Sequence, residues 1–161
     1  MNGSAPTTAA ESRPLSLLHL TRTFDAPRER VFRAWTDPEA VRRWFGSSIG
    51  PAQRVEADLR VGGRYRISVK LPPTGRLASA VGEYLEVDPP ERLVYTFSWE
   101  RMPMAFGLGN SKVTVEFMEI AEGTEVRLTH ELLDKRRLRA FHRFGWNTSM
   151  GRLAKLLDKE A

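Results

Sequence analysis

The sequence predicts a small α+β domain in which a curved antiparallel sheet wraps around a long C-terminal helix. Apolar and polar residues alternate over most of the segment 55–132, a pattern typical of strands with one apolar face. Gly-Gly and Pro-Pro pairs divide that segment into strands joined by hairpins. Residues 135–159 change to a helical period, and at ~1.5 Å per residue they are long enough to cross a whole sheet.

The chain before this sheet predicts one strand and two short helices. Residues 15–24 form the first strand, and Pro27 stands in a first helical turn, where its missing N–H costs nothing. Asp37 and Pro38 then serve as N-cap and first-turn residue of a second helix, which Gly46 is placed to end. The expected order is β-α-α-β-β-β-β-β-β-α.

In each predicted strand, every second residue is apolar, and we expect these residues to face the interior. In the strand predicted before Gly62-Gly63, the residues that share this parity are Val55, Ala57, Leu59 and Val61. In the strand over about 77–87 they are Leu77, Val81, Leu85 and Val87, and Glu83 shares their parity. Gly82 and Tyr84 blur this second pattern, and a bulge there would turn Glu83 outward.

Length and composition favour a single globular domain. The 161 residues and 41% hydrophobic content fit one core without an apolar run of membrane length. Residues 1–14 are rich in Ala, Ser, Thr and Pro, so we expect a disordered tail followed by one domain over 15–161. No secretory signal precedes it, which predicts the cytoplasm by default. The net charge of +5 comes from basic and acidic residues that are interspersed along the chain, and this argues against nucleic-acid binding.

The sequence contains no catalytic or cofactor motif. It has no nucleophile elbow, phosphate loop or dinucleotide fingerprint. The absence of cysteine excludes thiol chemistry, and His19, His130 and His142 are not paired at metal-ligand spacing. We therefore predict no catalytic residue, no metal and no cofactor.

A series of short motifs occurs in one order along the chain. They include Phe24-Asp25-Ala26-Pro27, Asp37-Pro38, Asp58-Leu59-Arg60-Val61-Gly62-Gly63, Gly82-Glu83-Tyr84, Pro90-Glu91-Arg92-Leu93 and Gly145-Trp146. With these motifs the chain resembles the Hsp90 ATPase activator homologue-like (AHSA1-type) family of the START/Bet v 1-like helix-grip superfamily, over nearly everything after the tail. The resemblance implies the helix-grip fold. For function it implies hydrophobic-ligand carriers, stress-linked proteins, Hsp90 partners or occasional enzymes.

Two polar residues are expected at the interior. His130 shares the parity of Val126 and Leu128, so it points to the apolar face, where a neutral imidazole either contacts a ligand or is satisfied by a neighbouring polar group. Glu83 is similar, although a carboxylate at a cavity is costly unless it is paired or hydrated.

The candidate cavity residues are mostly aromatic and come from every part of the fold. They are Trp35, Trp44, Tyr65, Glu83, Tyr95, Phe97, Trp99, Phe117, His130, Phe141 and Trp146. These residues form either an aromatic-lined pocket or a packed core. Gly145 in mid-helix costs about 1 kcal/mol relative to alanine, so it provides either close packing or room for a ligand. Arg152 on the same side is placed to pair with a buried acid. The apolar loop 101–110 suits a lid, a tucked hairpin loop or a dimer contact.

Three classes of function follow from these residues. The first is a protein that binds a small hydrophobic or amphipathic molecule in an internal cavity. The second is an interaction protein, either a stress-linked chaperone partner or a homodimer. The third is a cofactor-free enzyme in which Glu83 and His130 transfer protons on a bound organic molecule.

Overall fold

The structure is a computed structural model that describes residues 16–102, 111–132 and 136–159. The expected tail and most of the loop 101–110 lie outside the described residues. The elements are β1 (Ser16–Phe24), α1 (Arg28–Thr36), α2 (Pro38–Trp44), β2 (Arg54–Ala57), β3 (Arg64–Leu71), β4 (Arg76–Asp88), β5 (Arg92–Glu100), β6 (Ser111–Ile120), β7 (Gly123–Leu132) and α3 (Arg136–Lys159). Their order confirms the one that the sequence predicts.

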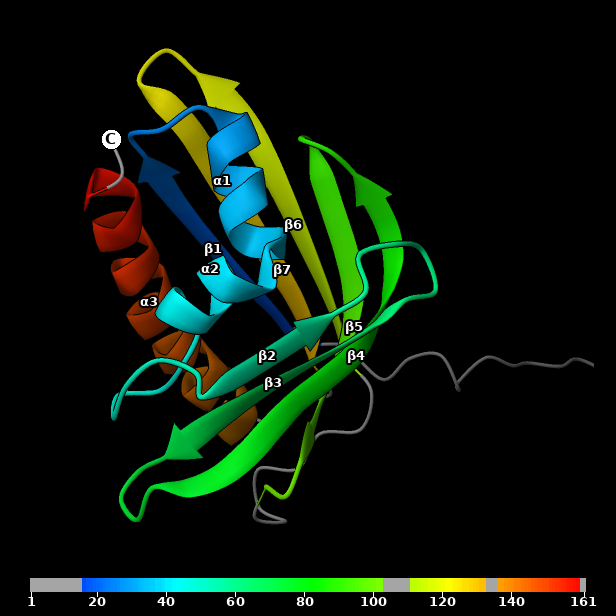
Figure 1. The fold of residues 1–161 in the computed structure, drawn as a ribbon, viewed down its shortest axis with the longest axis vertical. Helices are drawn as coiled ribbons and strands as arrows, with labels where there is room; N and C mark the ends of the chain where they lie inside the picture. Colours follow the sequence, from blue (N-terminus) through cyan, green and yellow to red (C-terminus); the bar gives the residue numbers. More distant parts are fainter. Residues whose placement is uncertain (1–15, 103–110, 133–135, 160–161) are drawn as a thin grey trace, which may run out of the picture.

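All seven strands form one antiparallel sheet in the order β1-β7-β6-β5-β4-β3-β2. Figure 1 shows that the strands β1, β7 and β6 lie along one line of the view, whereas β2, β3 and β4 lie across it, so the sheet curves around the helices. The helix α3 contacts both β1 and α2. The core therefore lies inside the curve, between the sheet and all three helices.

The two short helices begin and end for local reasons. Pro27 precedes α1, and the Asp37 carboxylate accepts a hydrogen bond from the Glu39 N–H at 3.3 Å at the start of α2. Gly46 stands directly after the C-cap Phe45, where a helix-ending glycine is expected, but it does not have the positive φ of such a cap. Gly46 instead pairs with Pro51 in a β-bridge, and a side chain there would collide with the Gly50 carbonyl.

The strand β2 is shorter than predicted. It ends at Ala57, and Leu59 and Val61 are exposed rather than part of the core. The chain folds back through residues 58–63, where a side chain at Gly63 would collide with the Asp58 carbonyl. This close backbone approach, which only glycine permits, overrides the alternating pattern.

As far as Tyr84, the strand β4 shows the opposite parity to the one predicted. Its inward residues there are Ala78, Ala80, Gly82 and Tyr84, whereas Leu77 and Leu85 are exposed. The reason is the neighbouring strand β3, which sets large residues beside small ones: Tyr65 pairs with Gly82, Ile67 with Ala80 and Val69 with Ala78. The register then shifts between Tyr84 and Glu86. Glu83 lies before this shift, between the inward residues Gly82 and Tyr84, and therefore faces outward. Val87, which follows the shift, packs against the core as predicted.

The helix α3 is continuous through Gly145 and Gly151, as predicted. Its buried residues are Leu138, His142, Trp146, Ser149, Met150, Leu153, Leu156 and Leu157. The Arg152 guanidinium donates to the Ser47 carbonyl, so it ties α3 to the loop after α2 rather than to a buried acid. Among the described residues, no helix is long and apolar enough to cross a membrane.

Candidate functional site

A buried aromatic cluster fills the centre of the fold. Trp146 of α3 lies 6.3 Å from Trp35 in a stacked arrangement, 5.7 Å from Phe45 and 6.1 Å from Phe97, measured between ring centroids. Trp35 also lies 4.6 Å from Trp44. These rings come from α1, α2, α3 and β5, so the cluster joins all three helices to the sheet. A cavity lies on each side of it.

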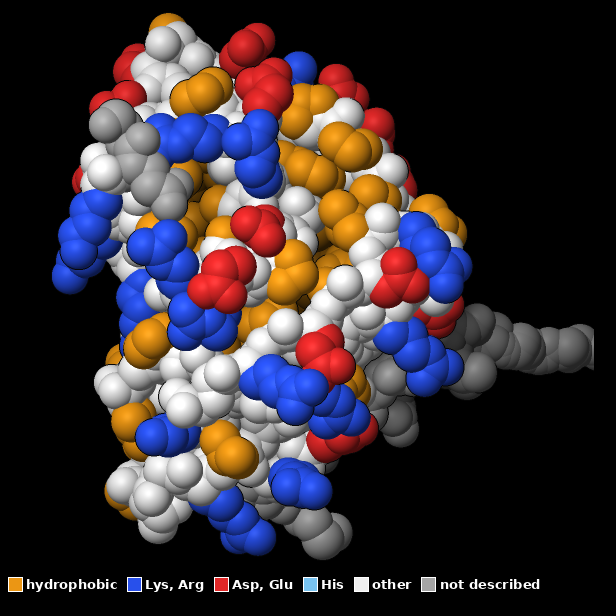
Figure 2. All heavy atoms as spheres, in the orientation of Figure 1, with side chains coloured by type: hydrophobic (Ala, Val, Ile, Leu, Met, Phe, Trp, Pro, Cys, Tyr) orange, Lys and Arg blue, Asp and Glu red, His pale blue; other side chains and the backbone are white. Residues whose placement is uncertain are grey.

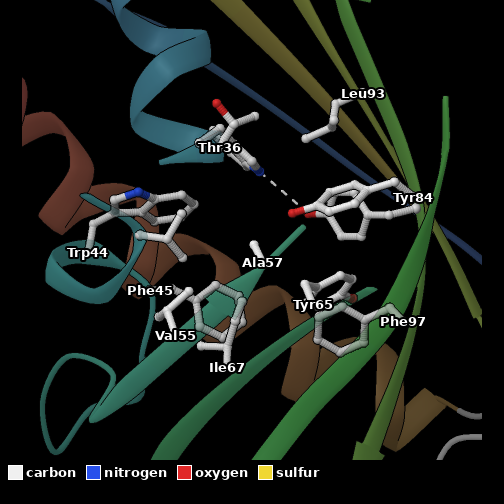
Figure 3. Close-up of a pocket in the computed structure, with 13 residues that line it drawn as sticks. Thr36, Trp44, Phe45, Val55, Ala57, Tyr65, Ile67, Tyr84, Leu93 and Phe97 are labelled. Atoms are coloured by element: carbon white, nitrogen blue, oxygen red, sulfur yellow. Dashed lines mark hydrogen bonds between the residues drawn. The ribbon is translucent and has the colours of Figure 1, made fainter. Parts of the chain in front are cut away.

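The first cavity, which we call the tyrosine lobe, is about 30 Å³. Its lining residues are Trp35, Thr36, Val41, Trp44, Phe45, Val55, Ala57, Tyr65, Ile67, Tyr84, Leu93, Tyr95 and Phe97. Figure 3 shows Trp44 and Phe45 approaching this lobe from the side of α2, and Tyr65, Tyr84 and Phe97 from the strands. On the face drawn in Figure 2, hydrophobic side chains gather between α1 and the strands β4 and β5.

The hydroxyls of Tyr65, Tyr84 and Tyr95 differ in their hydrogen-bond partners. The Tyr65 ring lies against Gly82, and its hydroxyl donates to the Thr96 carbonyl at 2.7 Å. The Tyr95 hydroxyl accepts from Trp35 Nε1 at 3.4 Å. Within the described residues, Tyr95 donates to no acceptor, and the Tyr84 hydroxyl has no hydrogen bond. The lobe thus holds two hydroxyl protons that the protein itself does not use.

Burial fixes the protonation state of these hydroxyls. It raises the pKa of Tyr84 to about 12 and raises the pKa of both Tyr65 and Tyr95 well above the ordinary tyrosine value. All three side chains are neutral at physiological pH. Tyr84 and Tyr95 can therefore serve as hydrogen-bond donors.

The second cavity, which we call the helix lobe, is about 70 Å³. Its lining residues are Phe45, Gly46, Ser47, Ser48, Val69, Leu71, Pro72, Phe97, Trp99, Phe141, His142, Phe144, Gly145, Trp146 and Ser149. A Cβ atom built on Gly145 meets nothing within 4 Å, so this glycine leaves room at the lobe rather than permitting close packing. Phe45 and Phe97 line both lobes.

His130 is held by hydrogen bonds to both of its ring nitrogens. Trp146 Nε1 donates to Nδ1 at 3.2 Å, so the proton of the neutral ring is on Nε2. Nε2 lies 2.8 Å from Ser111 Oγ, and that hydroxyl donates to the Phe97 carbonyl at 2.7 Å. The core histidine is thus fully satisfied by its neighbours.

His142 takes the opposite tautomer. Its Nε2 accepts from Trp99 Nε1 at 3.0 Å, and its Nδ1 donates to the Leu138 carbonyl at 2.7 Å. The two imidazoles lie edge to face with their centroids 5.1 Å apart. Burial lowers the pKa of His130 to about 3, with a smaller effect from His142, and lowers the pKa of His142 to about 4.

This arrangement does not build a catalytic pair. The imidazole nitrogens of His130 and His142 all have partners, and the Ser111 hydroxyl has both His130 and a carbonyl. Glu83 is exposed on the outer face, so the structure does not bring Glu83 and His130 together. Among the described residues, no group of three metal-ligating side chains occurs.

The other predicted site residues divide between the two lobes and the solid core. The tyrosine lobe takes Trp35, Trp44, Tyr65, Tyr95 and Phe97, and the helix lobe takes Phe97, Trp99, Phe141 and Trp146. Phe117 packs against Phe32 and Trp35 and lines neither lobe. Sequence reasoning missed Phe45, Tyr84 and His142. The helical spacing of His142 and Trp146, four residues apart, was the signal for His142.

A curved sheet that grips a long helix around an aromatic interior defines a helix-grip protein of the START/Bet v 1-like kind. Residues 25–158 match the family described as "Activator of Hsp90 ATPase homolog 1-like protein". The chain belongs to this family, as the motifs predicted.

Solved structures of the same fold come from several bacteria. An uncharacterized protein from Rhizobium leguminosarum is 28% identical, with a TM-score of 0.77 over 91% of this chain and 96% of its own. Protein CV1439 from Chromobacterium violaceum is 27% identical, with a TM-score of 0.73 over 88% and 96%. CalU16 from Micromonospora echinospora is 25% identical, with a TM-score of 0.69 over 91% and 78%. A comparison with the curated proteins found no match.

Proposed function

We propose that this protein binds a small apolar or amphipathic molecule between its sheet and its helices. The observation that carries the proposal is the pair of aromatic-lined lobes, which adjoin through Phe45 and Phe97. Binding sites for organic molecules are typically apolar and aromatic, with a few polar groups that fix orientation. The unused hydroxyls of Tyr84 and Tyr95 are such groups.

The size of the lobes limits the molecule. Each lobe is smaller than the cavity of about 150 Å³ that takes up benzene in an engineered core. We therefore expect a ligand built on about one ring that spans both lobes. Phe45 and Phe97 must then turn aside, because they are the residues that line both lobes.

A pair of leucine substitutions on α3 tests the proposal. Gly145→Leu places a side chain where the helix lobe is open. Gly151→Leu makes the same change about 1.7 turns further along α3, also in open space but away from the lobe. Ethylbenzene titrated into the ¹⁵N-labelled protein should give saturable shifts at residues of the lobes. Gly145→Leu should abolish these shifts and Gly151→Leu should keep them.

Two results would count against this function. The first is the absence of saturable binding by the wild-type protein to any of a set of single-ring molecules. The second is binding that Gly145→Leu and Gly151→Leu leave equally intact, because the molecule would then be held elsewhere.

A further inference from the structure

We propose that the bound molecule carries a neutral hydrogen-bond acceptor, such as the carbonyl oxygen of a ketone, ester or amide. This oxygen lies against the hydroxyls of Tyr84 and Tyr95 in the tyrosine lobe. The inference rests on the proposed function and specifies the chemistry of its ligand.

The first step is the charge of the lobe. Among its described lining residues there is no Asp, Glu, Lys, Arg or His. A charged ligand group would lose its water there without gaining a counter-ion, which is costly. The Asp58 carboxylate also acts on Tyr84, where together with burial it raises the pKa of the hydroxyl, and this disfavours an anionic group further. We therefore take the polar end of the ligand to be neutral.

The second step is the count of donors and acceptors. Thr36 and Tyr65 donate to main-chain carbonyls at 3.0 and 2.7 Å, and Trp35 donates to Tyr95. Among the described residues that line the tyrosine lobe, the polar protons without an acceptor are those of the Tyr84 and Tyr95 hydroxyls. The Tyr95 hydroxyl is buried and its proton has no acceptor in the part of the chain that the structure describes, whereas the Tyr84 hydroxyl keeps some contact with solvent. A ligand that brings an acceptor satisfies the buried Tyr95 proton and replaces water at Tyr84.

The third step is the orientation of the ligand. The buried polar side chains that line the helix lobe are His142, Trp146 and Ser149, and each is already hydrogen-bonded within the protein. This lobe therefore offers an apolar surface. The acceptor points toward β4 and β5, and the hydrocarbon part points toward Gly145 on α3.

Two probes of the same shape test the inference. Acetophenone carries a carbonyl oxygen where α-methylstyrene carries a methylene group, so only the ketone can accept a hydrogen bond. The alkene is more hydrophobic, and for this reason the informative quantity is the ratio of the two dissociation constants in each variant. The ratio is measured by NMR titration of the full-length chain.

Tyr84→Phe should weaken acetophenone binding by about three- to tenfold relative to α-methylstyrene, the loss expected for one neutral hydrogen bond. The double variant Tyr84→Phe/Tyr95→Phe should lower the preference for the ketone further. Tyr65→Phe removes a hydroxyl that is already engaged, so the affinities of both probes should change together and their ratio should stay. Circular dichroism of each variant checks that it is folded.

The outcomes separate the two proposals. If both probes bind and neither Tyr84→Phe nor the double variant changes the ratio, the carbonyl inference is wrong and the proposed function stands. If neither probe binds to the wild-type protein, both are wrong.

Discussion

At the residue scale, His130 and His142 are neutral because burial disfavours the imidazolium form, and each ring also accepts an indole N–H. A proton added to His130 Nδ1 or His142 Nε2 would face the N–H of Trp146 or Trp99. Protonation of either ring would therefore place a desolvated imidazolium in the core and also break a buried hydrogen bond. This geometry predicts that the fold is sensitive to acid.

The predicted consequence is a loss of stability below pH 6.5. The folded-state pKa values of about 3 and about 4 lie below the ordinary histidine pKa of 6.5, so the unfolded chain takes up protons first as the pH falls. The contribution of each histidine is complete above pH 6.5 and declines by about 1.4 kcal/mol per pH unit below it. Urea denaturation at pH 7.0 and 5.5 measures the decline.

A glutamine at position 142 isolates one of the two contributions. His142→Gln removes one titrating ring and should reduce the loss between pH 7.0 and 5.5 by about half. An unchanged pH dependence in this variant would show that His142 is not buried as a neutral ring.

The sequence predicts the place of His130 but not its partners. Strand parity alone directs His130 to the interior, and the structure confirms that it is buried. Ser111 and Trp146 lie on other elements, and no local pattern reports which side chains meet across a fold. The choice between a ligand-binding and a core histidine therefore required the three-dimensional contacts.

At the element scale, β4 depends on a glycine beside a tyrosine. A Cβ atom at Gly82 would collide with the Thr96 carbonyl and lie 2.7 Å from Tyr65 Cε1. Gly82→Ala should therefore destabilise the protein by about 1–3 kcal/mol, the usual range for overpacked cores. Gly50→Ala is the matched control, since its Cβ meets nothing within 4 Å. Equal unfolding midpoints for the two variants in denaturant would contradict the account.

The helix α3 allows the opposite experiment. Gly145→Ala adds a methyl group in open space and removes the entropic cost of a mid-helix glycine. We expect the free energy of unfolding to rise by roughly 0.5–1 kcal/mol. A loss of stability measured by thermal denaturation would mean that the space beside Gly145 is already filled.

These elements also show where parity fails as a predictor. Strands β5, β6 and β7 follow the apolar alternation, and their predicted faces are the buried ones. In β4 the inward residues are small because large side chains of β3 lie beside them. Hydrophobicity therefore pointed to Leu77 and Leu85, which are exposed. Glu83 shares their parity and is exposed too, which is the alternative that Gly82 and Tyr84 left open.

At the scale of the whole molecule, the order of elements and the family follow from the sequence, because each depends on local periods and turns. The two lobes do not, because each is formed by residues from several elements that meet only in the fold. Eight of the eleven predicted site residues line a lobe. Phe117 and His130 adjoin the lobes through ring contacts with Trp35 and Phe97, and Glu83 faces outward. A chaperone contact, a homodimer and a role in stress stay predictions.

The central claim is that the space between sheet and helices receives a small organic molecule. Crystals soaked with bromobenzene test it most directly, because bromine gives an anomalous signal that locates the ring without ambiguity. The account predicts a bromine peak inside the fold, between Gly145 and Phe97, with Phe45 or Phe97 turned from its present position. Peaks confined to the molecular surface, with both lobes unchanged, would contradict it.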